Sequence, residues 1–184
     1  MGGGIAQCVA LDHPGLVSSL TLIATSPAVP HPEGDRDLPP MTQEAQARFA
    51  AIAEPDWTDR DAVIDYIVEL ERACAGSRPF EDAEWRQLAG RVLDRTTNIQ
   101  SALTNHDALS DDDRPRPPLS SVKAPTLVVH GTGDPLLPHH GQALAAEIPG
   151  ARLLTVEGMG HEIPRIDWDV IVPAILEHTA GAES

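Results

Sequence analysis

The chain has 184 residues, 41% of them hydrophobic, which is typical of one folded domain. Its formal net charge of −15 leaves no obvious surface for neutralising phosphates, so we expect neither nucleic acid nor an anionic membrane as partner. Two cysteines are too few for a disulfide framework, and no run matches a membrane span or a signal peptide. We therefore expect a soluble cytoplasmic protein, and the length permits a complete enzyme.

Two proline clusters divide the sequence into three parts. One lies between residues 27 and 40, and the other between residues 115 and 125, just after the acidic run Asp111–Asp113. Because proline fixes φ and removes a backbone donor, both clusters predict irregular chain. We expect a first α/β piece over residues 1–28, a linker and helical insert over 29–117, and a second α/β piece over 118–184.

The first α/β piece predicts a helix followed by a strand. Apolar residues at near-helical spacing run over 2–13 and stop before Pro14, which disfavours helical geometry in the residue that precedes it. This pattern indicates a short, largely buried helix. The apolar, β-branched run over 19–24 is typical of a strand buried on both faces.

The insert has helical periodicity throughout. It predicts helices over 41–54, 81–97 and 99–109, and another that begins with the capping signal Thr58–Asp61 and ends near Gly76. The insert also holds most of the aromatic side chains, which form either its own small core or the apolar wall of a substrate cleft. These aromatic residues are Phe49, Trp57, Tyr66, Phe80 and Trp85.

Strands and helices alternate again in the last part of the chain. Strands are predicted over 125–130 and 152–156, and helices over 141–148 and 168–178. Alternation of this kind indicates a parallel sheet with helical crossovers, so the predicted fold class is α/β.

Glycine-rich loops follow the two late strands. The loop 130–138 contains Asp134, and the loop 157–164 contains His161. Alone, each residue is typical of a turn or a solvated loop. Because functional groups gather at the carboxyl ends of strands in open α/β sheets, and because the acid precedes the histidine, the pair predicts two members of a catalytic triad.

Three segments resemble the α/β-hydrolase family. Met1-Gly-Gly-Gly-Ile-Ala resembles the continuation of its nucleophile elbow, Gly-x-Ser-Met-Gly-Gly, from the residue after the serine. The segment 13–22 is similar to the helix-to-strand passage, and 124–138 and 158–164 resemble the acid and histidine loops. The match is weak across the middle, where the family carries variable helical caps. Within the family, the sequence is similar to aclacinomycin methylesterase-like hydrolases.

The resemblance implies a role for each matching residue. Asp134 becomes the triad acid, His161 the general base, and the backbone N–H of Met1 an oxyanion-hole donor. The family acts on small-molecule esters of carboxylic acids, and the resemblance implies no organic cofactor and no metal.

The resemblance also puts the nucleophilic serine immediately before Met1. We therefore expect the C-terminal portion of a serine hydrolase: a partial fold of about three parallel strands, flanking helices and a helical cap, without useful esterase activity alone. The first strand is expected to have a bare edge, which favours self-association.

Several alternatives stay open. A substitute serine within the chain lies outside any Gly-x-Ser-x-Gly elbow, and Ser26 is nearest to the expected site. Family members with an aspartate nucleophile, such as epoxide hydrolases, continue differently after that residue. A non-catalytic remnant that acts as an interaction or binding module is the alternative function. The serines considered as substitutes are Ser18, Ser19, Ser26, Ser120 and Ser121.

Four histidines lie around the two glycine-rich loops: His130, His139, His140 and His161. They lack the spacing of helical zinc ligands, and no cysteine accompanies them. We interpret them as solvated loop histidines and expect no metal site.

Overall fold

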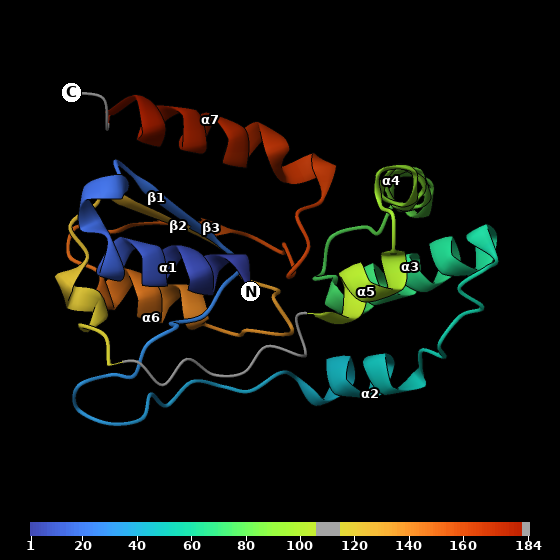
Figure 1. The fold of residues 1–184 in the computed structure, drawn as a ribbon, viewed down its shortest axis with the longest axis horizontal. Coiled ribbons are helices and arrows are strands. Elements are labelled where there is room, and N and C mark those ends of the chain that lie inside the picture. Colours follow the sequence, from blue (N-terminus) through green and yellow to red (C-terminus); the bar gives the residue numbers. More distant parts are fainter. Residues whose placement is uncertain (106–114, 182–184) are drawn as a thin grey trace.

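The computed structural model describes residues 1–105 and 115–181 and has an α/β architecture (Figure 1). Three parallel strands lie in the order β1-β2-β3, with bounds Leu20–Ile23, Thr126–Gly131 and Arg152–Val156. Helices α1 (Gly2–Asp12) and α6 (His140–Glu147) cover one face, and α7 (Trp168–Ala180) covers the other. The predicted α/β class and the three parallel strands are confirmed.

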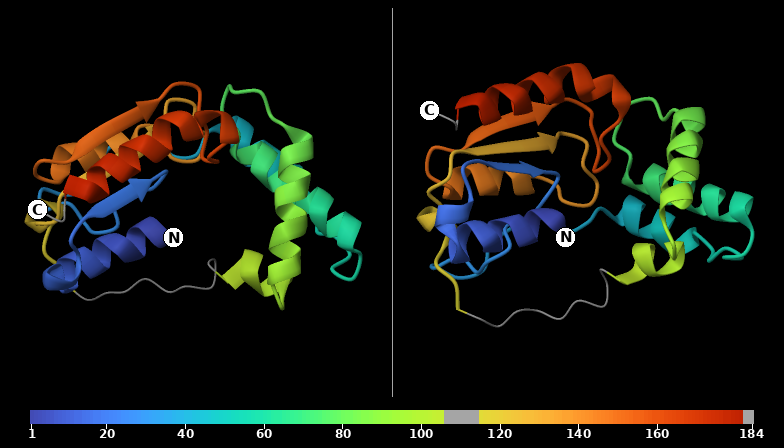
Figure 2. Two further views of the ribbon diagram at one scale, coloured as in Figure 1. Left: turned by 90° about the horizontal axis from the view of Figure 1, so that it is seen from above. Right: turned by 45° about the horizontal axis from the view of Figure 1, so that its top comes forward.

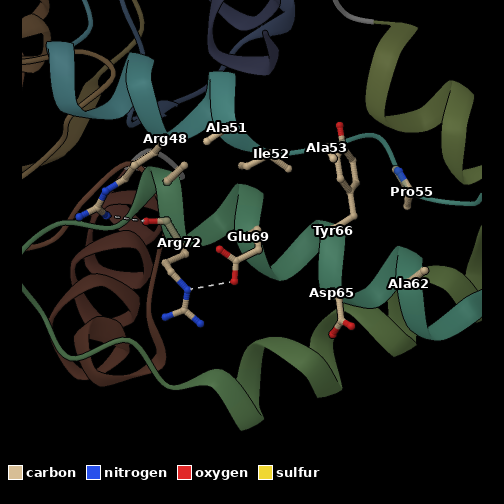
Figure 3. A pocket seen from close by; sticks show the side chains of 11 residues that line it. Arg48, Ala51, Ile52, Ala53, Pro55, Ala62, Asp65, Tyr66, Glu69 and Arg72 are labelled. Carbon is tan, nitrogen blue, oxygen red and sulfur yellow. Dashed lines mark hydrogen bonds and ion pairs between the residues drawn. The ribbon is translucent and has the colours of Figure 1, made fainter.

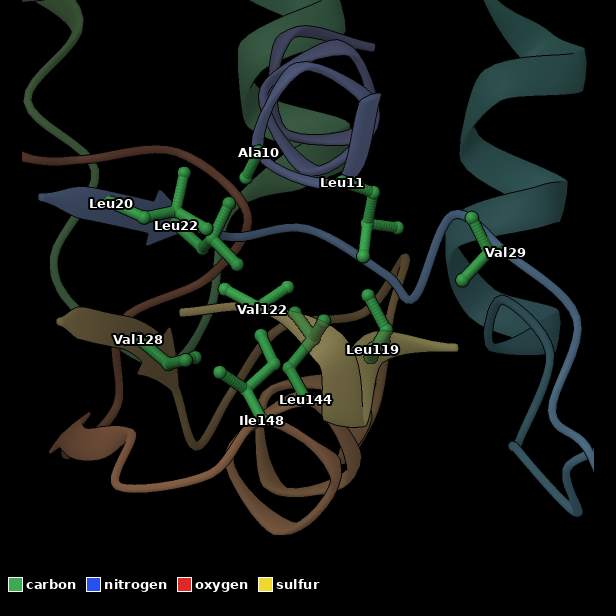
Figure 4. Close-up of a cluster of buried hydrophobic side chains, with 10 residues drawn as sticks. All are labelled: Ala10, Leu11, Leu20, Leu22, Val29, Leu119, Val122, Val128, Leu144 and Ile148. Carbon is green, nitrogen blue, oxygen red and sulfur yellow. The ribbon is translucent and has the colours of Figure 1, made fainter. Parts of the chain in front are cut away.

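The central strand β2 carries the core. All of its residues are buried, because helices cover both faces of the sheet. Val128 packs with Leu144 and Ile148 of the α6 segment on one face (Figure 4), while Leu127 and Val129 pack against the α7 side. This alternation follows from the two-residue period of a strand.

The edge strand β1 departs from its prediction. Leu20 and Leu22 are buried, but Thr21 and Ile23 are only half-buried, so the strand is not buried on both faces. The reason is its position at the edge of the sheet, where β2 is its one partner among the described strands.

Helix α1 forms where it was predicted but is less buried than expected. Ala10 and Leu11 face the sheet, while Ile5 and Val9 are 55% and 37% exposed. The prediction that this helix is largely buried is therefore wrong. Apolar spacing gives the helix and its face, but burial also depends on which elements pack around it.

The insert forms the helices that its periodicity predicts. They are α2 (Gln43–Ala51), α3 (Arg60–Cys74), α4 (Asp82–Arg95) and α5 (Ile99–Thr104). The Asp59 side chain accepts hydrogen bonds from the first turn of α3, one residue into the predicted capping signal. The acidic run Asp111–Asp113 and the end of the predicted helix 99–109 lie outside the described residues.

A small apolar core holds the insert together. Val63, Ile67 and Ala89 lie at its centre, and Trp57 and Trp85 pack against it. Phe80 stacks on Trp85 and also packs against this core, and Tyr66 meets Trp57 edge to face. The core interpretation is thus confirmed for Trp57, Phe80 and Trp85.

Short 3-10 turns complete the connections, at Pro14–Leu16, Leu119–Ser121 and Arg165–Asp167. Within the described ranges, every helix is too short or too polar to cross a membrane.

Candidate active site

The loops that follow β2 and β3 meet beyond the carboxyl ends of these two strands. The strands are parallel and adjacent, so both loops leave at the same side. Gly133 N–H donates to the Met159 carbonyl over 3.0 Å, and Gly158 N–H donates to Thr132 Oγ1 over 2.8 Å. These bonds hold the two loops side by side and bring the predicted Asp134 and His161 together.

Asp134 and His161 form a direct hydrogen bond. His161 Nδ1 lies 3.0 Å from Asp134 Oδ2, and because the ionised carboxylate only accepts, Nδ1–H is the donor. Asp134 is 4% exposed, whereas 29% of the His161 side chain is exposed. No described residue bonds His161 Nε2. This ring nitrogen is therefore free to take a proton from a reacting group.

The environment keeps Asp134 ionised. Burial pushes the pKa of Asp134 up, but the hydrogen bond and charge of His161 and the backbone N–H groups of Leu137 and Leu136 outweigh it. The pKa of this carboxyl therefore lies below its ordinary value. Asp134 Oδ1 accepts from Leu136 N and Leu137 N over 2.9 and 3.0 Å, which fixes the carboxylate in its loop. A fixed carboxylate orients the imidazole and stabilises its protonated form.

His130 forms a hydrogen bond with the loop that contains Asp134. It is 1% exposed, and its Nε2–H donates to the Leu137 carbonyl over 2.8 Å, with Asp134 Oδ2 3.6 Å away. Burial is the main reason that the pKa of His130 is lowered. The interpretation of a solvated loop histidine is therefore wrong for His130, because this ring lies at the end of the fully buried β2.

His140 is a second buried histidine, and it binds the candidate substitute serine. Its Nε2–H donates to the Pro39 carbonyl over 3.0 Å, so Nδ1, 2.9 Å from Ser26 Oγ, accepts from that hydroxyl. His140 is 8% exposed, which again corrects the solvated interpretation. Ser26 is thus paired with His140 and not with His161.

His139 and Met1 are the remaining predicted residues around the site. His139 is exposed and adopts a left-handed conformation with φ of 66°. Among residues 1–105 and 115–181, no three metal-ligating side chains gather into a possible metal site. Met1 caps the N-terminus of α1, which lies at the sheet edge where the strands end (Figure 2). Its role in an oxyanion hole stays a prediction.

Three residues near the pair were missed from the sequence: Glu71, Cys74 and Glu162. Glu71 and Cys74 lie in α3, far from Asp134 in the chain, so no local sequence pattern predicts that they lie near the pair. Burial and then the neighbouring carboxylates Glu71, Glu162 and Asp134 raise the pKa of Cys74 to about 12. The Cys74 thiol is therefore protonated at neutral pH and is a poor nucleophile.

Among the described residues, three cavities lie near or within the insert. One of about 420 Å³ adjoins the acid loop, between the insert residues Ala45 and Ser77 and the core residues Thr132 and Asp134. A larger one, of about 620 Å³, lies between α2 and α3 and is lined by insert residues alone (Figure 3). The first cavity is lined by Asp134. A third, of about 430 Å³, lies between α4 and the end of the histidine loop, where Trp85 faces Ile163 and Pro164.

Comparisons with known proteins show the family of this chain. Residues 1–164 match the family model of the alpha/beta hydrolase fold. Rhodomycin D methylesterase from Streptomyces peucetius is 27% identical over 99% of this chain and 65% of its own length. Pimeloyl-[acyl-carrier protein] methyl ester esterase from Aromatoleum aromaticum is 30% identical over 88% of this chain and 64% of its own.

A solved structure supports the fold. The 2-hydroxy-6-oxo-6-phenylhexa-2,4-dienoate hydrolase from Rhodococcus sp. strain RHA1 aligns with a TM-score of 0.64 and 17% identity. The alignment covers 98% of this chain and 61% of that structure. This chain thus spans about 65% of the length of the curated methylesterases that it matches.

Proposed function

Because the chain belongs to the α/β-hydrolase fold family, we propose that it carries the acid and the base of a serine hydrolase. In this proposal the substrates are small-molecule carboxylic esters, and more specifically methyl esters. The single observation that carries this proposal is the 3.0 Å hydrogen bond from His161 to the buried Asp134. Two relatives of this chain, rhodomycin D methylesterase and pimeloyl-[acyl-carrier protein] methyl ester esterase, support the substrate class.

The proposed mechanism uses the free ring nitrogen of His161. A serine hydroxyl attacks the ester carbonyl while His161 Nε2 takes its proton, and Asp134 holds the Nδ1–H tautomer and stabilises the imidazolium. The imidazolium then protonates the leaving alkoxide, and water hydrolyses the acyl-enzyme with His161 again as base. None of these steps calls for a metal or an organic cofactor.

We place the nucleophile and one oxyanion donor at the start of α1. In this proposal the serine directly precedes Met1, and the Met1 backbone N–H binds the oxyanion. Its support is the position of the α1 N-terminus at the edge where the strands end, together with the positive end of the helix dipole there. The pieces 1–28 and 118–184 then form the core, and 29–117 contains the cap over the site.

The experiment compares the 184-residue chain with the product of the reading frame extended upstream of the Met1 codon. We expect the extended frame to encode Gly-x-Ser immediately before Met1 and its product to hydrolyse p-nitrophenyl esters, whereas the 184-residue chain releases no p-nitrophenol above background. Extended DNA without that serine codon, or equal activity of both proteins, would contradict the proposal.

A specific observation favours a second function, an interaction module. Leu20 and Ala24 donate toward β2, so Thr21 and Ile23 between them direct their backbone groups to the other side, where no described strand lies. An unpaired strand edge with apolar surface beside it invites pairing with another chain. We propose that this edge mediates self-association, and a monodisperse monomer in sedimentation at micromolar concentration would contradict that.

Exposed apolar stripes on the two flanking helices support the same idea. On α1, Ile5 and Val9 are four residues apart, and on α7 Val172 and Leu176 are too, so each pair lies on one side of its helix. All four side chains are more than one third exposed. Substitution of Leu176→Lys and Ile5→Lys is expected to reduce the oligomeric mass, while Leu16→Lys, on the turn after α1, serves as the control.

A further inference from the structure

We propose that residues 74–78, which leave the C-terminus of α3, are a positioning element for His161, and that Glu162 is the positioning residue that fastens the insert to the histidine loop. This proposal rests on the proposed role of His161 as general base. In this proposal the insert has two roles: it covers the site, and it holds the His161 ring in position.

Backbone hydrogen bonds join the two segments directly. His161 N–H donates to the Cys74 carbonyl over 2.9 Å. Ser77 N–H and Arg78 N–H both approach the Gly158 carbonyl, at 2.9 and 3.3 Å. The loop is therefore held by the insert at the histidine itself and three residues before it, although the partners are 80 or more positions apart in the chain.

The two backbones touch so closely that only glycine fits between them. A Cβ atom on Gly76 would lie within 3.0 Å of backbone atoms of Gly158, Met159 and Gly160. A Cβ atom on Gly160 would likewise collide with backbone atoms of Gly76 and Cys74. Because backbone cannot swing aside as a flexible side chain can, a movement of residues 74–78 displaces the loop that carries His161.

Glu162 lies within this contact. It is 6% exposed, and the N–H groups of Glu162 itself, Gly76 and Gly160 favour its ionised form, although burial outweighs them and raises its pKa. A Cβ atom on Gly160 would lie within 3.0 Å of both Glu162 Oε2 and the Gly76 nitrogen, so the carboxyl lies where the insert and the loop meet. Its Oε2 is buried without a hydrogen-bond partner among the described residues. The charged or titratable groups that act on this region are Glu71, Cys74, Asp134 and His161.

A side-chain ion pair anchors the same segment to the core. Arg78 Nη2 lies 2.9 Å from Asp167 Oδ1, and Asp167, just before α7, is 1% exposed. The insert is thus fixed on both sides of the histidine loop. Asp134 determines which ring nitrogen of His161 carries the proton, whereas residues 74–78 determine the position of the ring.

The test uses the full chain with one change on the insert side and one on the loop side, Gly76→Ala and Glu162→Ala. The matched controls are Gly90→Ala in α4, where a Cβ meets nothing closer than 3.6 Å, and Glu157→Ala, an exposed residue of the same loop. Hydrogen–deuterium exchange by mass spectrometry reads the amides of 157–162, and long-range ¹H–¹⁵N NMR reads the His161 ring nitrogens.

We expect Gly76→Ala and Glu162→Ala to speed exchange across 157–162 about tenfold or more, a local opening, and to shift the His161 ring resonances. The controls are expected to change neither. Glu162→Gln is expected to fall between Glu162→Ala and the parent, because it keeps the size and one side-chain oxygen of Glu162 and loses only the charge. A merely structural role for Glu162 would change exchange without moving the ring resonances.

Parent-like exchange and ring resonances in Gly76→Ala and Glu162→Ala would overturn the proposal. If either variant unfolds throughout, Glu162→Gln decides, since a parent-like exchange and ring spectrum in that variant would also contradict it. Asp134→Asn separates this proposal from the proposed function, because it is expected to change the His161 tautomer while exchange at 74–78 stays as in the parent. Lack of activity in the extended protein would overturn the proposed function and leave the positioning result intact.

Discussion

Two histidines of this protein, His140 and His161, each bond a side-chain oxygen through Nδ1 but differ in what bonds Nε2. His140 and His161 each use Nδ1 to bond a side-chain oxygen, Ser26 Oγ at 2.9 Å and Asp134 Oδ2 at 3.0 Å. His140 Nε2–H donates a hydrogen bond to the Pro39 carbonyl, whereas no described residue bonds His161 Nε2. The Ser26–His140 contact therefore links two segments through both ring nitrogens, whereas the Asp134–His161 contact leaves His161 Nε2 available for the proposed role as base.

The partner of Nδ1 reinforces this difference. The Ser26 hydroxyl donates to its histidine and so uses the ring as an acceptor, which leaves no lone pair for catalysis. The Asp134 carboxylate accepts from its histidine, and its lowered pKa keeps it charged beside the ring. Only the second arrangement stabilises an imidazolium during proton transfer.

The largest expected effect is on turnover in the upstream-extended protein. His161→Ala is expected to lower kcat about 10⁶-fold and Asp134→Asn about 10⁴-fold, because the first removes the base and the second leaves the wrong tautomer. His140→Gln is the matched control and is expected to stay within about tenfold of the parent. Steady-state ester hydrolysis checks all three, and comparable losses at His140 and His161 would abolish the distinction between the two histidines.

A second prediction concerns the thiol near the Asp134–His161 pair. With a pKa of about 12, Cys74 is almost wholly protonated at pH 8. Its alkylation by iodoacetamide is therefore expected to be about a thousandfold slower in the folded chain than in urea. Peptide mass spectrometry follows the rate at Cys74 itself. Fast labelling of the folded chain would mean that His161 activates the thiol and is not committed to Asp134.

A third prediction uses stability to compare the two pairs. His140→Ala removes the partner of the Pro39 carbonyl and leaves the Ser26 hydroxyl only its 3.5 Å contact with the Pro27 carbonyl, and is expected to lower the free energy of unfolding by about 1–3 kcal/mol. Ser26→Ala is expected to cost about 1 kcal/mol. His161→Ala removes a ring that is 29% exposed and is expected to cost less than His140→Ala. Urea unfolding gives the order, and the reverse order would show that His161 is the structural residue.

The smallest expected effect is a pH dependence. Because the folded state lowers the pKa of Asp134 below its ordinary 3.8, this carboxylate stabilises the fold above that value, and the contribution is lost as pH falls through the lowered pKa. The stability difference between the parent and Asp134→Asn is expected to be larger at pH 6 than at pH 3. Urea unfolding at both pH values measures it, and a constant difference would mean that the charge of Asp134 contributes nothing.

The sequence predicted those parts of the fold and site that depend on local patterns. Helix and strand positions followed from periodicity, and the capping signal at Asp59 marked the start of α3. Asp134 and His161 were found because each lies in a glycine-rich loop directly after a strand, and parallel strands end together. These signals lie within a few residues of the feature that they predict.

Features that depend on distant contacts were not predicted. The burial of His130 and His140 comes from packing in the sheet and from the Ser26 and Pro39 segments, which no spacing in the loops reveals. The contact of Gly76 with the histidine loop joins residues more than 80 positions apart. Likewise, Ile5 is exposed because no described element packs over it on α1, and the residue pattern of α1 does not reveal this.

The most direct test of the central claim is fluorophosphonate labelling of the upstream-extended protein, followed by peptide mapping. We predict one labelled serine immediately before Met1, with labelling lost in His161→Ala and retained in His140→Ala. Label on Ser26 that is lost in His140→Ala would contradict the account, because it would make the Ser26–His140 contact the reactive pair.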